Sequence, residues 1–443
     1  MKTIKTRVCV LGAGAGGTGA VYRLIKNGIK TTVIDKYPDF GGTSVFCGVD
    51  GWEPGVTLDG LHLLLKDELE KMDKACHVIE VVPNCNLFNP ENGLNWDNHS
   101  FKKYPWGLSL PMGKTYEDVY KCCKLYKTAE EKFNRFQFEP DAMRTAINNV
   151  FAPYKENLIT FFGCSFKESI SENGKIIAII IENDEDTVKI EADYFVDATG
   201  DIILARDAGC QHSFGRDGDE YNEPCGGEKD DNVNGVSYIF RVGRVDDSEH
   251  IDPIAEEYRI DLGEWANDRM KRTVSCFFTY PNGDINVNML PTMEGIDYYK
   301  LGDKADFYGR ARVYAYWNYL QREKNMKGYT IKHIYDAGVR ESYRLIGKHV
   351  LTENDIRNGG AGKGRTIAIA DHAVDVHGNS RMSSELEKPY EVPLECTMTN
   401  EYENLFVASR GASFSHVAQS SVRLVRTIMS IGEGVGEYIS EII

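Results

Sequence analysis

The sequence lacks the features of a membrane-spanning or nucleic-acid-binding protein. No apolar run approaches the ~18 residues that a membrane span needs. The apolar stretch 8–11 near the N-terminus stops at Gly12, short of the roughly 7–15 residues in the apolar core of a signal peptide. Basic residues are a minority, 51 Lys and Arg against 67 Asp and Glu, and the formal charge of -16 repels a phosphate backbone. We therefore expect neither a membrane nor a nucleic acid as partner.

Paired cysteine motifs are also missing. The eleven cysteines are scattered, and no two are separated by just two residues as in a zinc ribbon or a thioredoxin-type site. This pattern is typical of reduced thiols and predicts a cytoplasmic protein. Asp371, His372, Asp375 and His377 are residue types that bind zinc or iron, but their spacing matches no closed site. We predict no metal.

The first 35 residues carry a strand, a glycine-rich turn, a helix and a second strand. We expect strands at 8–11 and 31–34 and a helix over 17–27, which Gly28 ends. The turn between them matches G-x-G-x-x-G, with glycines at 12, 14 and 17. Such a turn offers the N–H groups of a helix N-terminus to a pyrophosphate, which the second glycine allows to come close. The opening segment therefore predicts a Rossmann-type dinucleotide site.

An acidic residue ends the second strand. Asp35 follows Gly12 by 35 − 12 = 23 residues. A carboxylate at that place accepts hydrogen bonds from both ribose hydroxyls and repels a 2′-phosphate.

A pair of adjacent glycines, Gly41 and Gly42, follows Asp35 and indicates which class of dinucleotide-binding protein this is. The segment 41–44 reads Gly-Gly-Thr-Ser, a three-stranded meander is expected over 158–197 and ends in 198–201, and 404–411 reads as a strand followed by a turn. Together these segments resemble the glutathione-reductase-like superfamily of flavoproteins with two dinucleotide-binding domains. The resemblance implies FAD as the cofactor, and it places the N-terminus of the closing helix at the N1–O2 edge of the flavin.

Three further segments, 47–56, 340–347 and 414–419, are similar to the FAD-dependent oxidoreductase family that often carries the label xanthan-lyase-like. Two departures from the superfamily are clear. Ser44 and Val49 stand where disulfide reductases have cysteines, and no second G-x-G-x-x-G follows a strand. We therefore expect neither a dithiol relay nor a separate NAD(P)H domain.

The resemblance implies an α/β fold with a Rossmann-type FAD-binding domain of three-layer ββα architecture and a mixed α+β substrate domain. We expect the FAD-binding domain at 1–51, 136–212 and 336–443, and the substrate domain at 52–135 and 213–335. The residues expected to bind the cofactor are Gly12, Ala13, Gly14, Ala15, Gly16, Gly17, Asp35, Lys36, Gly41, Gly42, Thr43, Ser44, Phe166, Ala198, Thr199, Gly200, Asp201, Ser409, Arg410, Gly411 and Ala418.

The rest of the chain alternates between regular and irregular stretches. Hairpin signals occur at Asn173-Gly174 and Asn282-Gly283. Expected helices lie near 58–77, 115–133, 140–150, 252–270 and 303–324, with one long helix after residue 416. Expected strands lie at 158–169, 175–182, 187–197, 236–242, 285–290 and 404–408.

Two residues are candidates for catalysis. His416 lies near the start of the closing helix and is a possible base for an alcohol. Arg340 and Arg344 share one face if their segment is helical. They either clamp an anionic substrate or form a structural salt bridge with Glu341 or Asp355. Aromatic side chains at 96–106 either stack on a sugar or belong to a core.

We therefore predict a cytoplasmic oxidoreductase that transfers hydride between a small organic substrate, such as an alcohol or carbohydrate, and flavin N5. Two alternatives stay open: a flavin-dependent reductase fed with electrons by a partner protein, and a non-catalytic flavin-binding subunit. The sequence assigns neither the electron acceptor nor the oligomeric state.

Overall fold

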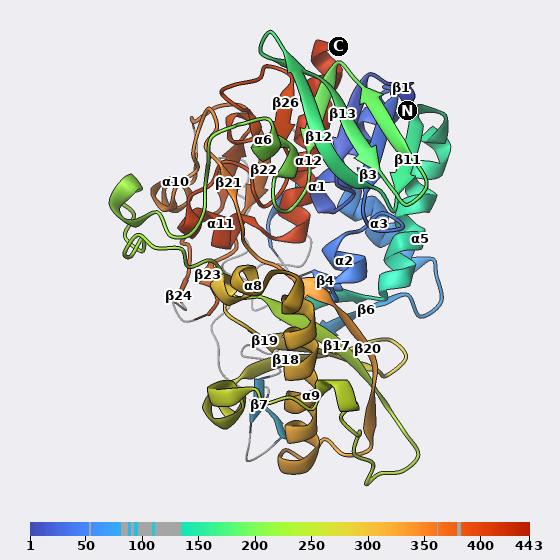
Figure 1. Cartoon of the computed structure of the whole chain (residues 1–443), viewed down its shortest axis with the longest axis vertical. Helices are drawn as coiled ribbons and strands as arrows, with labels where there is room; N and C mark the ends of the chain where they lie inside the picture. Colours follow the sequence, from blue (N-terminus) through green and yellow to red (C-terminus); the bar gives the residue numbers. More distant parts are fainter. Residues whose placement is uncertain are drawn as a thin grey trace.

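A five-stranded parallel sheet lies at the centre of the upper half of the molecule (Figure 1). The computed structural model describes residues 1–52, 55–80, 87–89, 93–95, 109–110, 134–360, 362–378 and 382–443. The strand order is β11 (Leu158–Phe162), β3 (Thr31–Asp35), β2 (Val8–Leu11), β15 (Tyr194–Asp197) and β26 (Leu405–Val407). All four residues of β2 are buried, as the unbroken apolar run of a strand covered on both faces requires.

Two helices pack tightly against each other beside this sheet, α1 (Ala15–Lys26) and α12 (Val425–Ile442). Small residues allow the contact. A Cβ atom on Gly19 would lie 2.1 Å from the carbonyl oxygen of Met429, and one on Gly432 would lie 1.9 Å from that of Gly16. The close packing fixes the position of the glycine-rich turn that begins α1.

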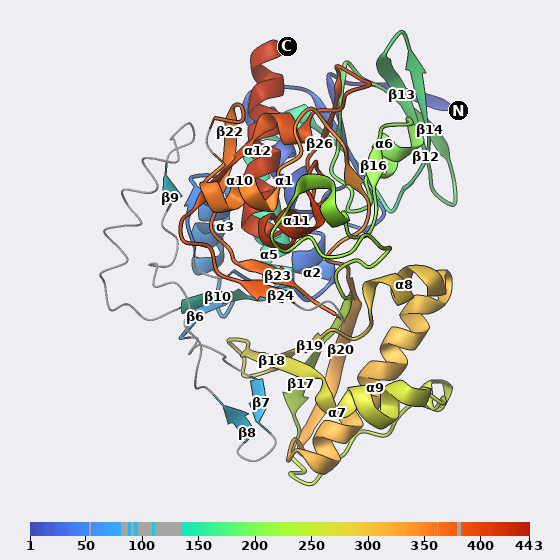
Figure 2. The same ribbon diagram turned by 90° about the vertical axis from the view of Figure 1, so that its left-hand side faces the viewer.

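A four-stranded sheet forms another layer, opposite the helices in the turned view (Figure 2). Its order is β1 (Lys2–Lys5), β14 (Thr187–Glu191), β13 (Lys175–Glu182) and β12 (Ser165–Glu172). Asn173 and Gly174 join β12 to β13 with φ of 51° and 73°, as a type I′ hairpin turn requires. The predicted α/β fold with two sheet layers and a helix layer is confirmed.

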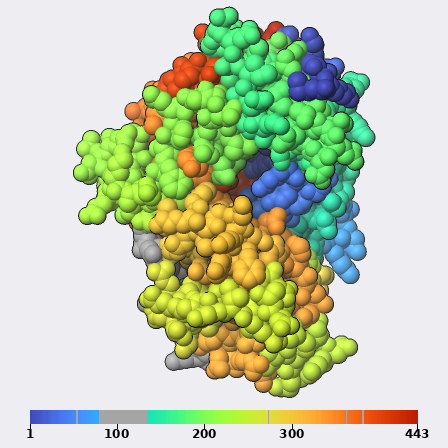
Figure 3. Space-filling view, viewed as in Figure 1, coloured from blue at the N-terminus to red at the C-terminus, as the bar shows by residue number. Residues whose placement is uncertain are grey.

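A second hydrophobic core occupies the lower half of the molecule (Figure 1). Here the antiparallel sheet has the order β18 (Val274–Thr279), β19 (Ile285–Leu290), β17 (Ser237–Arg244) and β20 (Tyr329–Gly338). Helix α9 (Ala305–Glu323) covers it and buries Trp317 against Phe240. In the space-filling view a hollow lies between the two halves, beside the blue N-terminal part (Figure 3).

Shorter elements complete the described part of the chain. The helices are α2 (Thr43–Phe46), α3 (Leu61–Glu70), α5 (Pro140–Phe151), α6 (Ile203–Asp207), α7 (Met270–Arg272), α8 (Gly295–Leu301), α10 (Glu353–Asn358) and α11 (His416–Val422). The strands are β4 (Gly51–Trp52), β5 (Thr57–Leu58), β6 (Cys76–Glu80), β7 (Leu87–Asn89), β8 (Gly93–Asn95), β9 (Ser109–Leu110), β10 (Asn134–Phe138), β16 (His212–Ser213), β21 (Arg344–Leu345), β22 (Thr366–Ala370), β23 (Val374–Val376), β24 (Met382–Ser384) and β25 (Tyr390–Pro393). Trp52, Leu61 and Leu65 belong to the first hydrophobic core, which surrounds the parallel sheet.

Two predicted strands are in fact each divided between two sheets. The strand predicted at 158–169 becomes β11 in the parallel sheet and β12 in the four-stranded sheet. Gly163, with φ of 68°, lies at the change of direction. The strand predicted at 187–197 likewise divides into β14 and β15. The expected three-stranded meander is therefore present as β12, β13 and β14, but its first and last strands are shorter than predicted because β11 and β15 belong to the parallel sheet.

Two helix predictions also need correction. The closing helix is interrupted at Leu424, whose ψ of 145° is extended, so α11 and α12 are separate. Over 252–270 the chain forms a 3-10 turn at Glu256–Tyr258 and then, from residue 263, a short helix that passes through a π-helical turn at Trp265–Arg269 into α7. The prediction is therefore correct only in its C-terminal part.

Two predictions lie outside the described residues: the helix at 115–133 and the aromatic stretch at 96–106. Within the described ranges, no helix is both long enough and apolar enough to span a membrane.

Candidate functional site

The glycine-rich turn lies at the carboxyl edge of the parallel sheet. Gly12 has φ of 100°, and a Cβ atom there would lie 2.7 Å from the carbonyl carbon of Ala198. A Cβ atom on Gly17 would lie 1.8 Å from the carbonyl oxygen of Gly12. Both glycines are therefore required by the fold itself.

Gly14 differs from these two glycines. It is the N-cap of α1 with φ of -70° and ψ of -165°, a conformation that any residue adopts. A Cβ atom on Gly14 would meet nothing within 4 Å. The helix N-terminus has no side-chain cap and no acidic residue in its first turn. The fold does not need glycine here, whereas a ligand that approaches the backbone closely does.

Asp35 ties the turn to the second strand. Its Oδ2 atom accepts from the backbone N of Ala13 at 2.5 Å, and its Oδ1 atom accepts from the N of Tyr37 at 2.8 Å. Burial raises the pKa of this carboxyl, and both backbone donors oppose the shift. Lys36 beside it is exposed, with its Nζ atom 5.3 Å from the ring centre of Tyr37.

The second glycine pair folds back over the first turn. Gly41 donates from its backbone N to the carbonyl oxygen of Ala13 at 3.0 Å. A Cβ atom on Gly42, whose φ is 47°, would lie 2.6 Å from the Cα of Gly14. Ser44 follows in α2, and its buried Oγ atom has no partner among the residues that the structure describes.

The ends of β15 and β26 bring the other predicted segments to the same edge. Arg410 lies over Gly200, where a Cβ atom would be 1.9 Å from Nη1, and its Nη2 atom is 3.2 Å from Oδ1 of Asp201. Asp197 accepts from both the N and the Oγ1 of Thr199, at 3.0 and 2.7 Å. Ser409 accepts from the N of Gly411 at 3.1 Å.

The donor set at this edge suits a dinucleotide pyrophosphate. It combines an uncapped helix N-terminus, the open face of Gly14, the unpaired Ser44 hydroxyl and the Arg410 guanidinium. Phe166 lies in β12 of the four-stranded sheet, packed against the hydrophobic core around the parallel sheet, and Ala418 lies in α11. The structure thus brings the predicted residues 12–17, 35, 41–44, 198–201 and 409–411 together, and they fit FAD.

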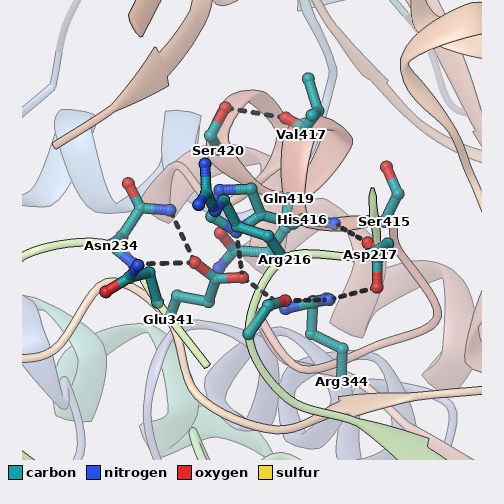
Figure 4. A network of polar contacts seen from close by, with 12 residues as sticks. Arg216, Asp217, Asn234, Glu341, Arg344, Ser415, His416, Val417, Gln419 and Ser420 are labelled. Carbon is teal, nitrogen blue, oxygen red and sulfur yellow. Dashed lines mark hydrogen bonds and ion pairs between the residues drawn. The ribbon is translucent and has the colours of Figure 1, made fainter. Parts of the chain in front are cut away.

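His416 belongs to a buried polar network (Figure 4). Its Nδ1 atom is 2.9 Å from Oε1 of Glu341, which also accepts from Nη1 of Arg344. The other oxygen of Glu341 accepts from the N and Nδ2 of Asn234 at 2.8 and 2.9 Å. Burial alone would raise the pKa of Glu341, but its interactions with His416 and Arg344 lower it to about 2. Three donors besides the histidine, one from Arg344 and two from Asn234, therefore hold the ionised carboxylate in place beside His416.

A second carboxylate lies at the N-terminus of α11. Asp217 accepts from the backbone N of His416 at 2.6 Å and from Nη2 of Arg344 at 2.8 Å. Ser415 caps the same helix by accepting from the N of Ala418 at 3.1 Å. The N-terminus of α11 was expected to face the flavin N1–O2 edge. Two of its N–H groups already donate to Asp217 and Ser415.

Arg340 and Arg344 do not share a helix face, because residues 339–343 form no helix and Arg344 lies in β21. The predicted salt bridge of Arg344 with Glu341 is confirmed. Asp355 pairs instead with His349 and Lys363, at 3.4 and 3.2 Å.

Arg340 has neutral acceptors. Its Nη1 atom donates to the carbonyl oxygen of Gly235 at 2.8 Å and to Oγ of Ser237 at 2.9 Å. Arg423 lies near it, 3.3 Å from Oδ2 of Asp375, which is also 2.7 Å from Nε2 of His377. Asp375 and His377 are thus hydrogen-bonded to each other. Within the described ranges no three His, Cys, Asp or Glu side chains are grouped as metal ligands, and the eight described cysteines form no disulfide with one another.

Sequence reasoning missed Asp217 and Asn234. The first lies 199 residues from His416 and the second 107 residues from Glu341. Neither residue belongs to a motif. Their residue types alone could not have marked them, because Asp and Asn are common in surface loops.

Comparisons with known proteins agree with this geometry at the family level. A family model described as FAD dependent oxidoreductase matches residues 7–440. A curated relative, the glutamate synthase [NADPH] small chain of Halomonas elongata, is 45% identical over 40 residues, which is 9% of this chain and only 8% of that relative.

Solved structures resemble the chain distantly. A geranylgeranyl bacteriochlorophyll reductase-like protein of Thermoplasma acidophilum is 14% identical with a TM-score of 0.49, over 99% of this chain and 79% of that one. A p-nitrophenol 4-monooxygenase of Pseudomonas putida is 10% identical with a TM-score of 0.42, over 79% and 70%. A flavin-dependent brominase is 11% identical with a TM-score of 0.46, over 99% and 80%.

Proposed function

Because this chain belongs to the family of FAD dependent oxidoreductases and FAD is its cofactor, we propose that it oxidises a small organic alcohol with His416 as the acid–base group. The observation that carries the proposal is the buried contact of 2.9 Å between Nδ1 of His416 and Glu341. Bound FAD supplies the electron chemistry, as the acceptor of the electron pair. The side chains of the protein bind and orient the substrate and accept its proton.

The cofactor is assigned to the carboxyl edge of the parallel sheet. The pyrophosphate would lie at Gly14, at the N-terminus of α1, within reach of Ser44 and Arg410. Asp35 would accept from the ribose hydroxyls, because each carboxylate oxygen still has acceptor capacity beside its backbone donor. Support comes from the open space at Gly14 and from the buried hydroxyl of Ser44 without a partner in the described ranges.

His416 is held in one tautomer by its neighbours. Glu341 accepts at Nδ1, so Nδ1 carries the proton and Nε2 is left as the basic nitrogen. Within the described part of the chain, Nε2 has no hydrogen-bond partner. A substrate hydroxyl would donate its proton to Nε2, and the Glu341 carboxylate would stabilise the resulting imidazolium.

The test compares His416→Gln with His212→Gln, an exposed histidine whose Nδ1 contacts the carbonyl oxygen of Cys210. Both variants should retain FAD, measured by visible absorption. A panel of alcohols and hydroxy acids is mixed anaerobically with the holoenzyme, and bleaching of the flavin is followed by stopped flow. His416→Gln should slow bleaching by about a hundredfold or more. Bleaching of this variant at the wild-type rate would contradict the proposal.

A further inference from the structure

Arg340 lies where the two cores meet. Its Nη1 atom donates to Gly235 and Ser237 at the start of β17, which belongs to the second core. Its carbonyl oxygen accepts from Nε2 of Gln419 in α11 at 2.7 Å. Junctions between cores are preferred places for small-molecule sites. Residue 340 is thus tied to both sides of such a junction, to β17 through its guanidinium and to α11 through its backbone carbonyl.

Arg423 places a second guanidinium on the same side. It follows His416 by 423 − 416 = 7 residues, which is two helical turns, so the two residues share one face of α11 and its end. Residues 340 and 341 face the two residues of this pair. The side chain of Glu341 contacts His416, and the charge of Arg423 acts on Arg340, the neighbour of Glu341 in sequence. The two arginines therefore adjoin the proposed acid–base group, Arg340 through residue 341 and Arg423 along α11.

The carboxylate that acts on the charge of Arg340 is Asp375, which Arg423 and His377 already contact. Burial, followed by the charge of Arg340, lowers the pKa of His377 to about 4, so this ring is neutral at pH 7. The other groups nearby are His372, which acts on Asp375, and the Cys276 thiol, which acts on Arg340. Among the described residues, Arg340 therefore has no carboxylate in contact with its guanidinium.

Arg340 itself has capacity to bind an anion. Both hydrogen bonds of its side chain start from Nη1 and go to neutral acceptors, and within the described ranges Nε and Nη2 have no acceptor. Burial and the neighbouring charge of Arg423 lower the pKa of this guanidinium to about 9. A desolvated cation without a counter-ion is unfavourable, and a carboxylate that receives two parallel N–H groups relieves it.

We propose that Arg340, assisted by Arg423, binds the carboxylate of the substrate, so that the substrate class is a small hydroxy acid. The proposal rests on the proposed function, since it names the substrate of the same site. The acid group would be held at Arg340 while the hydroxyl lies at Nε2 of His416. No new bond is formed at Arg340, which orients the substrate and is a binding group.

The experiment measures binding to the holoenzyme without turnover. Matched pairs of probes are titrated: glycolate against ethylene glycol, lactate against 1,2-propanediol, and glucuronate against glucose. The readouts are the difference spectrum of the bound flavin and the thermal midpoint. We expect at least one carboxylate to give a saturable response that its neutral counterpart lacks. Equal responses within every pair, or no response to any carboxylate, would overturn the proposal.

Variants assign the response to Arg340. Arg340→Gln should weaken carboxylate binding roughly tenfold or more, and Arg340→Lys, which keeps the charge, should lose less. Arg259→Gln, an exposed arginine that donates to the carbonyl oxygen of Ile254, is the matched control. FAD content and the thermal midpoint show whether each variant is folded. Unchanged carboxylate binding in a folded Arg340→Gln holoenzyme would overturn the proposal.

Two further outcomes distinguish this proposal from a role of Arg340 at the reduced flavin and from the proposed role of His416. If Arg340→Gln shifted the flavin reduction potential and left carboxylate binding unchanged, the charge would serve the reduced flavin and the substrate assignment would be wrong. His416→Gln should keep carboxylate binding. If this variant also kept the wild-type bleaching rate, the role of His416 would fail while the carboxylate site stood.

Discussion

Glu341→Gln is the sharpest perturbation of the buried network. The substitution keeps the shape of the side chain and removes its charge. The two oxygens of Glu341 receive four donors, from Arg344, His416 and twice from Asn234. A glutamine has one oxygen and one NH₂ group, so in either orientation its NH₂ faces two donors. No rotation of the amide satisfies the network.

The pKa of Glu341 sets the size of the effect. In the fold it falls from the ordinary 4.5 to about 2. At about 1.36 kcal/mol for each pKa unit, the ionised form contributes about 3 kcal/mol to the free energy of unfolding. Because the folded value is depressed, this contribution is present above about pH 4.5 and is lost as the pH falls toward about 2. Breaking one partner of a buried ion pair costs about 3–5 kcal/mol, which agrees.

The assay is thermal unfolding followed by near-ultraviolet circular dichroism. The control is Glu249→Gln, the same chemical change in an exposed residue whose Oε2 atom is 2.7 Å from Nζ of Lys327. That pair is worth about 0–1 kcal/mol. At pH 7 Glu341→Gln should unfold well below both the wild type and the control, and the gap should narrow below pH 4.5. Equal midpoints for the two variants at pH 7 would refute the reasoning.

Two other predictions follow from buried groups near α1. Burial raises the pKa of Glu433 from 4.5 to about 7 despite its contact with Arg23, so the wild type should lose about 3 kcal/mol of stability as the pH rises through that interval. Glu433→Gln should lack this dependence, and parallel curves of midpoint against pH for the two proteins would count against it. Gly16→Ala should be strongly destabilised, because its Cβ atom would lie 1.7 Å from the carbonyl oxygen of Ala408. A wild-type melting curve for this variant would show that the backbone yields there.

Local patterns in the sequence predicted the elements that local physics determines. The strand at 8–11 and the start of α1 follow from an apolar run and the glycines after it. The turn at Asn173-Gly174 follows from the left-handed backbone that these two residues tolerate. Such features depend on neighbours in sequence, so a single chain suffices to find them.

The missed features depend on partners that are distant in sequence. Nothing in the run 158–169 says that its first half pairs with β3 and its second half with β13, although Gly163 marks the change. The candidate site shows the same limit. His416 was found because it lies near the start of the predicted closing helix, but Asp217 lies 199 residues away, and only the fold brings its carboxylate to α11.

The central claim is that FAD binds at the open face of Gly14, and the FAD content of Gly14→Ala and Gly14→Val tests it most directly. Both variants should fold as apoproteins with the wild-type midpoint, because φ of -70° suits any residue and a Cβ atom meets nothing within 4 Å. Their purified forms, after incubation with FAD, should hold progressively less flavin than the wild type, measured by visible absorption. Stoichiometric FAD in Gly14→Val, or none in the wild type, would contradict the account.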